Sequence, residues 1–449
     1  MNVHFIAIGG SAMHNLAIAL HIKGYNITGS DDEIFEPAKS RLAKYSLLPP
    51  VIGWNPKLIN NSLDAVILGM HAKEDNPELI KAKKLGIKIF SYPEYLYEQS
   101  KNKTRIVIAG SHGKTTITAM ILHALNFYNI DCDYMVGAML DGFDVMVKLT
   151  AHNKIIILEG DEYLTSPIDK RPKFHLYRPD IALISGIAID HINVFPNDDI
   201  YLDQFRTFIN LISPGGSLVY NANDPQVASI VSNANKTLSL FPYSLPAYTI
   251  DNGITRIILN DNIYNLQIFG QHNLSNSEGA RIICNLLGID DNQFYLSLAT
   301  FKGASKRLEI IAQTINSVFF RDFAHSPSKL LATILAVKNQ FPNRKLVACF
   351  ELHTFSSLNK EFLPRYKDTL NSADIPIVYY SPHALQLKRL PPVNPQDIIK
   401  AFNNPNIIIA TNPDDLKQIL TSIEWQNKNL LMMSSGNFDN LNILQTLNL

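Results

Sequence analysis

Hydrophobic positions in this chain repeatedly change from a nearly unbroken run to a helical spacing, with a short turn between them. Residues 3–8 and 106–109 are such runs, and their length and β-branched content predict buried strands. Beyond each turn, apolar residues recur every three or four positions, which is typical of a helix with one buried face. These positions are Leu16, Ala17 and Leu20 in the first helix, and Ile117, Met120, Ile121, Ala124 and Leu125 in the second. The alternation predicts an α/β fold with mainly parallel sheets flanked by helices.

The pattern divides the chain into three α/β domains, at residues 1–103, 104–307 and 308–449. A length of 449 residues agrees with about three domains. The polar residues 101–103 form the predicted linker between the first two domains. Further strands are predicted at residues 26–28, 65–68, 87–90, 154–158, 181–184, 318–322, 346–350, 377–380, 407–410 and 430–433. We expect the first and last domains to be similar to dinucleotide-binding folds.

The turn after residues 106–109 has the composition of a phosphate-binding loop. It contains, in order, Gly110, Ser111, His112, Gly113, Lys114, Thr115 and Thr116. The glycines let the backbone approach a ligand closely, and the N-terminus of the following helix attracts an anion. Lys114 adds a positive charge, and the Thr115 hydroxyl is placed to reach Mg²⁺. The usual P-loop has four residues between its glycines and this turn has only two. A tight turn with a solvated lysine is therefore the alternative.

Polar residues follow the next two strands of the middle domain. Glu159, Asp161 and Glu162 offer the hard oxygen ligands that Mg²⁺ prefers. A solvated strand end is the alternative for this acidic cluster. Asp190 and His191 follow the other strand, although nitrogen is an unusual ligand for Mg²⁺ and a single histidine is more often structural.

A second glycine turn ends the first strand of the chain at Gly9 and Gly10. Asp31 lies about 20 residues further along, where a dinucleotide fold places its ribose-binding acid. The third glycine of that fingerprint is missing, because Ala12 and Met13 occupy its region. A purely structural turn and an NAD site are both alternatives for this segment.

Composition and charge narrow the class of protein. The chain is 46% hydrophobic and 18% charged, which is typical of a globular protein. Lys plus Arg and Asp plus Glu are both 40, so the balance argues against a nucleic-acid partner and favours a small-molecule substrate. Three cysteines without paired spacing fit a reducing compartment. With no basic leader and no apolar run of membrane-spanning length, we expect a cytoplasmic protein without a membrane partner.

Taken in order, these motifs resemble those of the Mur ligase family, the ATP-dependent amide-forming enzymes of peptidoglycan assembly. The short loop at residues 110–116 is similar to the family's P-loop, which implies that it binds ATP and that Lys114 is catalytic. In the family, the first acid of the cluster, here Glu159, binds Mg²⁺. A histidine matching His191 binds a second metal, which implies a catalytic role. The implied metal ligands are Thr115, Glu159 and His191.

Near the second metal the sequence departs from the family pattern. The family often has an Asn and a Glu where Gly186 and Ala188 stand. A lysine that is carbamylated in some members corresponds in register to a position near Arg206, and arginine cannot be carbamylated. Gly186 and Ala188 therefore leave the ligands of the second metal open, and we assign no role at Arg206.

Residues 270–276 resemble the family's Gly-x-His-Asn-x-x-Asn motif, which opens a helix and contacts adenine. The resemblance implies Asn273 and Asn276 as ATP-binding residues. A side-chain amide offers the donor and acceptor pair that an adenine edge requires. Helix capping by Asn273 or Ser275 is the alternative.

Two motifs near the start of the third domain also resemble the family. Residues 306–309 are similar to an Arg-x-Glu motif, which implies that Arg307 lies near the ATP phosphates. Residues 322–327 are similar to an Asp-Tyr-Ala-His-x-Pro segment, whose acid, here Asp322, faces the nucleotide. Pro327 suits the first turn of the helix that we expect to follow, through residue 339.

Members that take UDP-N-acetylmuramate have an N-terminal turn similar to the one in this chain, which holds the UDP diphosphate. The resemblance therefore implies a UDP-linked sugar rather than NAD in the first domain. The implied binding residues are Gly9, Gly10, Ser11, Ala12, Met13, Ser30 and Asp31.

Residues 168–174 resemble a segment of the branch that joins UDP-N-acetylmuramate to a recycled murein tripeptide, through an acyl phosphate. A basic loop suits an anionic substrate, and the glycine turn after residues 430–433 could receive a carboxylate. The residues assigned to the peptide are Lys170, Arg171, His325, Ser435 and Gly436. The alternatives are the branch that adds L-alanine to the same nucleotide, an NAD-dependent dehydrogenase, and a P-loop ATPase without ligase activity.

Overall fold

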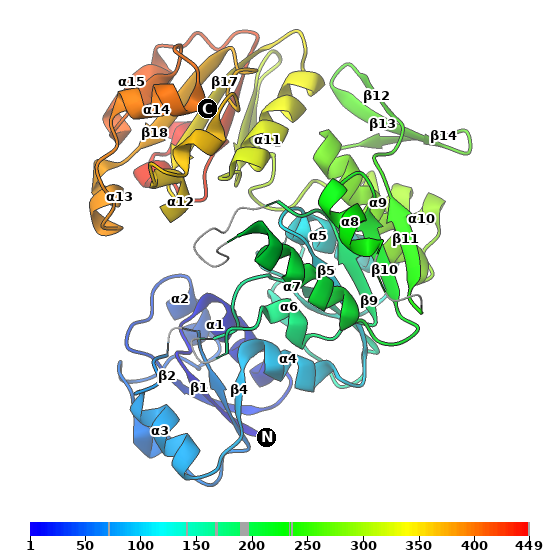
Figure 1. Cartoon of the computed structure of the whole chain (residues 1–449), viewed down its shortest axis with the longest axis vertical. Coiled ribbons are helices and arrows are strands. Elements are labelled where there is room, and N and C mark those ends of the chain that lie inside the picture. The colour runs from blue at the N-terminus through cyan, green and yellow to red at the C-terminus, as the bar shows by residue number, and fades with distance from the viewer. Residues whose placement is uncertain are drawn as a thin grey trace. The chain divides into compact units, whose positions relative to one another are not determined.

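The computed structural model describes residues 1–70, 72–140, 142–166, 169–188, 197–232, 234 and 237–447. Its strands form four sheets, of which three are mainly parallel and flanked by helices (Figure 1). These three sheets fall within residues 2–91, 104–243 and 309–433, so the predicted α/β class is confirmed. None of the described helices is long and apolar enough to cross a lipid bilayer.

The N-terminal sheet has four parallel strands in the order β2-β1-β3-β4. Its elements are β1 (Asn2–Ile6), α1 (Ser11–Ile22), β2 (Asn26–Ser30), α2 (Ala38–Lys44), η1 (Pro56–Leu58), β3 (Ala65–Leu68), α3 (Pro77–Lys84), β4 (Ile89–Ser91) and α4 (Tyr92–Ser100). The strand predicted at residues 87–90 begins two residues later and ends at Ser91. The Ser91 hydroxyl accepts the N–H of Glu94, so this residue also caps α4.

The central sheet has seven strands in the order β11-β10-β9-β5-β8-β6-β7, and only the β6–β7 pair is antiparallel. Its strands are β5 (Thr104–Ala109), β6 (Asp133–Met135), β7 (Val147–Lys148), β8 (Ile155–Glu159), β9 (Ile181–Ile184), β10 (Ser217–Asn221) and β11 (Ser239–Tyr243). Its helices are α5 (Lys114–Phe127), α6 (Lys173–Leu176), α7 (Asp198–Asn210) and α8 (Pro225–Val231). Because β5 lies between β8 and β9, the turns that follow these three strands meet at one edge of the sheet.

A three-stranded antiparallel sheet, which the hydrophobic pattern did not predict, follows the central sheet in the chain. It contains β12 (Tyr248–Asp251), β13 (Ile254–Leu259) and β14 (Asn262–Leu266). Its strands alternate buried and exposed positions, so they lack the unbroken apolar runs of the parallel strands. Helices α9 (Gln271–Leu286) and α10 (Asp291–Leu298) follow it.

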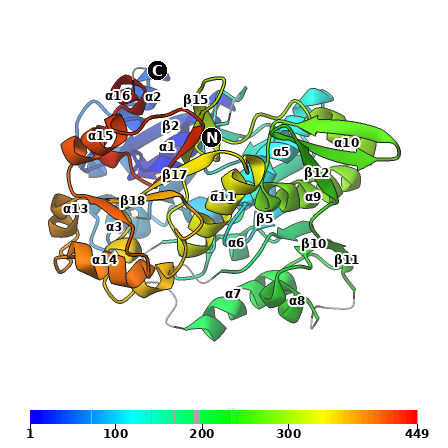
Figure 2. The same ribbon diagram turned by 90° about the horizontal axis from the view of Figure 1, so that it is seen from above.

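The C-terminal sheet has six strands in the order β15-β16-β20-β17-β18-β19, and only β15 is antiparallel to its neighbour. The strands are β15 (Glu309–Gln313), β16 (Val318–Asp322), β17 (Lys345–Leu352), β18 (Ile375–Tyr380), β19 (Ile408–Ala410) and β20 (Lys428–Met433). The helices are α11 (Pro327–Gln340), α12 (Phe355–Leu358), η2 (Leu363–Tyr366), α13 (Pro382–Leu387), α14 (Pro395–Phe402), α15 (Pro413–Thr421), η3 (Phe438–Asn440) and α16 (Ile443–Leu447). Helix α11 lies along β17 (Figure 2). Both faces of the sheet are buried, since adjacent residues such as Phe319 and Phe320 enter different hydrophobic clusters.

The chain forms two compact units. The first consists mainly of Met1–Ile187 and Asp198–Tyr243, and therefore contains both the N-terminal and the central sheet. The second consists mainly of Ser244–Arg281 and Leu287–Leu449. Each sheet falls within one of the three predicted domains, but the three-stranded sheet is grouped with the C-terminal sheet and not with the central one. The domain boundaries at residues 103 and 307 stay predictions.

The predicted linker at residues 101–103 is anchored by a buried ion pair. The ammonium of Lys103 pairs with the carboxylate of Asp133 at the start of β6 and donates to the carbonyl of Thr150 at 2.8 Å. Asp133 is completely buried and also accepts the N–H and hydroxyl of Thr150 and the amide of Asn153. The first residue before β5 is thus fixed to the neighbouring part of the central sheet.

Replacing Asp133 with Ala leaves the Lys103 ammonium without its buried partner, so we expect the free energy of unfolding to fall by about 3–5 kcal/mol. Asp131→Ala is the matched control, because Asp131 pairs with Lys148 where both side chains are partly exposed. That pair should contribute only about 0–1 kcal/mol. Urea denaturation of both variants measures the difference, and equal losses would contradict the role given to the buried pair.

Candidate active site

The loop between β5 and α5 requires glycine at its two predicted positions. Gly110 has a φ of 125°, and a Cβ atom there would lie 2.2 Å from the hydroxyl oxygen of Ser185. Gly113 has a φ of 81° and is the residue directly before α5. Both positions disfavour any other residue. The loop therefore brings its backbone to the N-terminus of α5, as a phosphate site requires.

The turn after β9 holds this loop in place. The carbonyl of Gly186 accepts the N–H of Ser111 at 2.9 Å. The Ser185 hydroxyl lies 3.2 Å from the carbonyl oxygen of Ala109 and also contacts that of His112. Ser185 escaped sequence analysis, although it directly follows a predicted strand, because serine at a strand end has many ordinary uses.

Tyr201 of α7 supports the same loop from another side. Its hydroxyl lies 2.8 Å from the Ser111 hydroxyl, and both side chains are buried. No local motif marks Tyr201, which is ninety residues further along the chain. Only the tertiary structure identifies it.

Lys114 is a buried cation whose charge is already paired. Its ammonium donates to the carbonyl of Gly110 at 2.7 Å and forms an ion pair with Glu162 at 2.8 Å. Burial alone would lower the pKa of Lys114, but the Glu162 carboxylate outweighs burial and raises it. The lysine is therefore charged, and a phosphate entering the loop competes with Glu162 for it.

Thr115 and Glu159 meet as predicted for two metal ligands. The Thr115 hydroxyl donates to one carboxylate oxygen of Glu159 at 2.7 Å, and the N–H of Gly137 donates to the other at 2.7 Å. Burial raises the pKa of Glu159, and the nearby Asp161 adds to this effect. A hydroxyl and a carboxylate at this separation are the hard oxygen donors that suit Mg²⁺. Gly137 was missed by sequence analysis, since it belongs to no recognisable motif.

Among the described residues, the other side chains predicted near the metals add nothing to the Thr115–Glu159 pair. Asp190 and His191 lie outside the described residues. Asp161 instead forms an ion pair with Lys173 at 3.4 Å. Within the described parts of the chain, no group of three or more His, Cys, Asp or Glu side chains is arranged to hold a metal ion. The role of His191 stays a prediction.

The predicted UDP-sugar residues converge at the carboxyl ends of β1 and β2. The N–H of Gly9 donates to a carboxylate oxygen of Asp31 at 2.7 Å, and the carbonyl of Ser30 accepts the N–H groups of Ala7 and Ile8. A Cβ atom at Gly9 would lie 2.9 Å from the same oxygen of Asp31. Burial raises the pKa of Asp31 to about 6. The close approach explains why this position is glycine.

The other residues of the predicted UDP loop belong to the start of α1. Gly10 directly precedes the helix, and Ser11 and Ala12 are its first two residues. Met13 is buried, and its side chain packs beside the turn, since a Cβ atom at Gly10 would lie 3.4 Å from the Met13 Cγ atom. The N-terminus of α1 thus lies at the ligand-binding edge of a parallel sheet.

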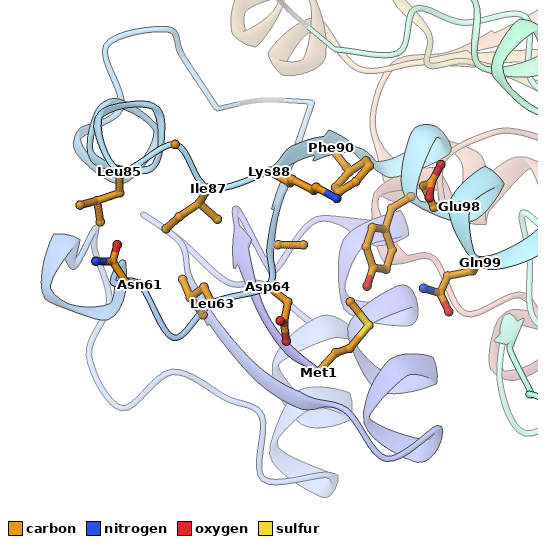
Figure 3. A pocket seen from close by; sticks show the side chains of 13 residues that line it. Met1, Asn61, Leu63, Asp64, Leu85, Ile87, Lys88, Phe90, Glu98 and Gln99 are labelled. Atoms are coloured by element: carbon orange, nitrogen blue, oxygen red, sulfur yellow. The ribbon is translucent and has the colours of Figure 1, made fainter.

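A cavity of about 640 Å³ lies at the opposite edge of the N-terminal sheet (Figure 3). Figure 3 shows Met1, Asp64 and Lys88 among its lining side chains. Each of these three residues directly precedes a strand, namely β1, β3 and β4, so the cavity lies at the amino ends of the strands. No residue of a predicted site lines this cavity.

In the second unit, Asn273 lies in the first turn of α9. Its amide donates to the carbonyl of Phe269 at 3.0 Å, across Gly270, whose φ is 89°. Because α9 begins at Gln271, neither Asn273 nor Ser275 caps the helix, and that alternative is wrong. The expected adenine contacts of Asn273 and Asn276 stay predictions.

Arg307, Asp322 and His325 are close together in the second unit. Asp322 is buried, and its carboxylate accepts the N–H groups of Leu308 and Ala324, each at 2.7 Å. Burial raises the pKa of Asp322, and the Arg307 charge opposes this. The guanidinium of Arg307 lies 4.7 Å from the centre of the Phe323 ring, and the His325 ring packs edge-on against the same ring. Asp322 therefore joins the residue before β15 to the turn between β16 and α11, whatever it does toward a nucleotide.

The predicted carboxylate-binding turn after β20 already uses two of its N–H groups. That of Gly436 donates to the Ser434 hydroxyl at 2.6 Å, and that of Phe438 donates to the buried carboxylate of Glu351 at 2.9 Å. The hydroxyl of Ser435 is buried and has no hydrogen-bond partner among the described residues. The proposed use of this turn for a peptide carboxylate stays a prediction.

Replacing Lys114 with Ala should lower kcat by about a thousandfold, as for other single donors to a developing charge. Because the buried Glu162 would lose its ion pair with Lys114, the change should also lower the free energy of unfolding by about 3–5 kcal/mol. The double variant Lys114→Ala/Glu162→Gln should regain most of this stability but none of the activity. Urea denaturation and an ATP turnover assay separate the two effects, and near-normal turnover would contradict the phosphate-binding role.

Glu159→Gln should raise the Mg²⁺ concentration needed for half-maximal activity by at least about tenfold, since an amide oxygen is a weaker ligand than a carboxylate. Asp161→Asn is the control, because Asp161 pairs with Lys173 outside the Thr115 contact. A Mg²⁺ titration of initial rates measures both. A shift only in the control would transfer the metal-binding role to Asp161.

Comparison with known proteins identifies the family to which this chain is similar. Residues 2–104 match the profile of the Mur ligase family catalytic domain, and residues 108–284 match that of the Mur ligase middle domain. A UDP-N-acetylmuramate–L-alanine ligase from Sulfurihydrogenibium is 30% identical over 448 residues, covering 98% of this chain and 96% of the relative. The enzyme of the same name from Clostridium acetobutylicum is 32% identical, covering 83% of this chain and 82% of its own.

Solved structures agree in fold. A murein peptide ligase from Psychrobacter arcticus is 22% identical with a TM-score of 0.67, covering all of this chain and 98% of its own. The UDP-N-acetylmuramate–alanine ligase of Thermotoga maritima is 20% identical with a TM-score of 0.72, covering all of this chain and 97% of its own. With a P-loop, a threonine–carboxylate pair and relatives that match over nearly its full length, this chain belongs to the Mur ligase family.

Proposed function

We propose that this enzyme joins the carboxylate of UDP-N-acetylmuramate to the amine of a recycled murein tripeptide. Members of the Mur ligase family are ATP-dependent, ADP-forming ligases that make C–N bonds in peptidoglycan synthesis, and this chain is one of them. That membership removes the dehydrogenase and the non-ligating ATPase as alternatives. The identity of the two joined substrates is the proposal.

The nucleotide-sugar half of the proposal is supported by the contact between Gly9 and Asp31. This contact forms a turn at the N-terminus of α1, in the same compact unit as the P-loop. A helix N-terminus beside closely approaching backbone suits a diphosphate. The enzyme names of the curated relatives include UDP-N-acetylmuramate, which is consistent with a UDP-linked substrate here.

The proposed reaction uses the charged groups around the P-loop. The lactyl carboxylate of the muramic acid receives the γ-phosphoryl group of ATP and becomes an acyl phosphate. The incoming amine then attacks the acyl carbon, and phosphate leaves from the tetrahedral intermediate. Lys114 supplies a fixed positive charge for the phosphoryl oxygens. Mg²⁺ held by Thr115 and Glu159 would neutralise further charge on the phosphates.

The acceptor half of the proposal depends on the segment at residues 169–174. Arg171 pairs with Asp169 at 2.6 Å and with Glu94 at 3.4 Å, so its charge is used within the protein. Lys170 is exposed, and no described carboxylate lies within ion-pair distance of its ammonium. A tripeptide brings carboxylates that need positive partners. Lys170 is therefore the residue we assign to the peptide, while Arg171 fixes the loop.

L-Alanine is the second candidate acceptor. The names of the curated relatives, at 30% and 32% identity, favour it. The N–H groups of Gly436 and Phe438 also favour it, because both are bonded within the protein and are not available to a peptide carboxylate.

A tripeptide ending in a diamino acid should support ligation at least tenfold better than L-alanine in kcat/KM. This preference corresponds to about 1.4 kcal/mol of transition-state binding. The measurement is ADP release with ATP, UDP-N-acetylmuramate and either acceptor. Lys170→Gln should reduce the preference by charge loss alone, whereas Lys88→Gln, an exposed lysine at the other edge of the N-terminal sheet, should not change it.

A preference for L-alanine would replace the tripeptide as acceptor and leave the nucleotide-sugar assignment unchanged. ADP release that does not depend on UDP-N-acetylmuramate would instead overturn the nucleotide-sugar assignment.

A further inference from the structure

Arg41 of α2 is a cation whose contacts are neutral groups. Its guanidinium donates to the amide oxygen of Asn15 at 3.0 Å and lies 3.5 Å from a ring nitrogen of His14. The sulfur atoms of Met139 and Met146 lie 2.7 and 3.7 Å from its two terminal nitrogens. Among the described residues, no carboxylate is within ion-pair distance of Arg41. Arg41 is only partly buried, so its charge is available to an anionic ligand.

The guanidinium lies on the first turns of α1. Helices α1 and α2 are in contact, and both views show them side by side (Figures 1 and 2). The His14 ring lies 2.9 Å from the carbonyl oxygen of Gly10, and the Asn15 amide donates to the carbonyl of Ser11 at 2.7 Å. The two residues of α1 that contact Arg41 are thus bonded to backbone carbonyls at the start of this helix.

His14 does not supply a second positive charge beside Arg41. Burial lowers the pKa of His14, the carbonyl of Gly10 opposes this, and the Arg41 charge lowers it further. The imidazole is therefore neutral at physiological pH, and Arg41 supplies the positive charge beside this turn.

We propose that Arg41 is a substrate-binding residue that pairs with the phosphates of a nucleoside diphosphate sugar at the N-terminus of α1. This inference depends on the nucleotide-sugar site of the proposed function and adds to it a residue outside the glycine turn. A guanidinium binds phosphate oxygens through two parallel N–H groups, which a lysine cannot do. The present contacts include two thioethers, which are weak acceptors, so exchanging them for phosphate oxygens is favourable.

The contacts also explain how Arg41 is aimed before substrate binds. The Asn15 amide fixes one nitrogen of the guanidinium from α1. Met146 contacts the same nitrogen and Met139 contacts the other terminal nitrogen, both from the segment between β6 and β7. A side chain restrained in this way loses less conformational entropy on binding than a free one.

The test is the affinity of the purified protein for UDP-N-acetylmuramate, UDP and uridine, measured by titration calorimetry. Arg41→Ala should weaken binding of UDP-N-acetylmuramate and UDP by about 10- to 100-fold, as expected for a lost charge-assisted pair. Uridine carries no phosphate, so its affinity should change less than about twofold. Arg41→Lys should recover only part of the loss. Lys39→Ala, on the exposed side of α2, is the matched control and should bind all three ligands normally.

Each outcome of this titration has a defined meaning. If the unaltered protein does not bind UDP-N-acetylmuramate, the proposed function is wrong, and the inference about Arg41 fails with it. If it binds normally and Arg41→Ala binds equally well, the inference about Arg41 is wrong. A loss of uridine affinity as large as that of UDP would also overturn the inference, because Arg41 would then only support the shape of α1 and α2. Pyrophosphate that competes with UDP in the unaltered protein but not in Arg41→Ala would support it.

Discussion

The hydrogen bond between Thr115 and Glu159 exists because β5 and β8 are neighbours in register. Ile108 pairs with Glu159 across these strands, so the residues after β5 lie beside the last residue of β8. The adjacent β9 brings Ser185 to the same edge, where it supports the P-loop. A parallel arrangement of three strands thus places the glycine loop, the carboxylate predicted to bind metal and a supporting hydroxyl together. Much of the site follows from this arrangement.

Local sequence patterns predicted the elements and turns of the site well. Strands β1 and β5, helices α1 and α5, and the glycines at 9, 110 and 113 depend on neighbouring residues, so their signals are local. The proximity of Gly9 to Asp31 also follows from the dinucleotide-fold spacing. Predictions of this kind succeed because helix and strand periodicity reports burial directly.

The partners of charged side chains within the protein could not be predicted from the sequence, because they depend on the tertiary structure. Lys114 was expected to supply positive charge to a phosphate, and the structure adds that it is buried against Glu162. Arg171 was assigned to the peptide substrate, and the structure adds that it forms ion pairs with Asp169 and Glu94. Arg41 received no role from the sequence, since nothing in α2 resembles a motif. The three-stranded sheet was missed for another reason, namely that its half-exposed strands have no unbroken apolar run.

The pairing of Lys114 with Glu162 has a consequence for how nucleotides exchange. A phosphate that enters the P-loop does not find an isolated ammonium, because it must take the place of an internal carboxylate. The net affinity is then a difference between two ionic contacts and not the full strength of one. When the product leaves, Glu162 can resume its contact at once, so the empty loop is never left with an unbalanced buried charge. If the loop binds the nucleotide as we propose, the protein contains its own competitor for that nucleotide, which favours turnover over retention.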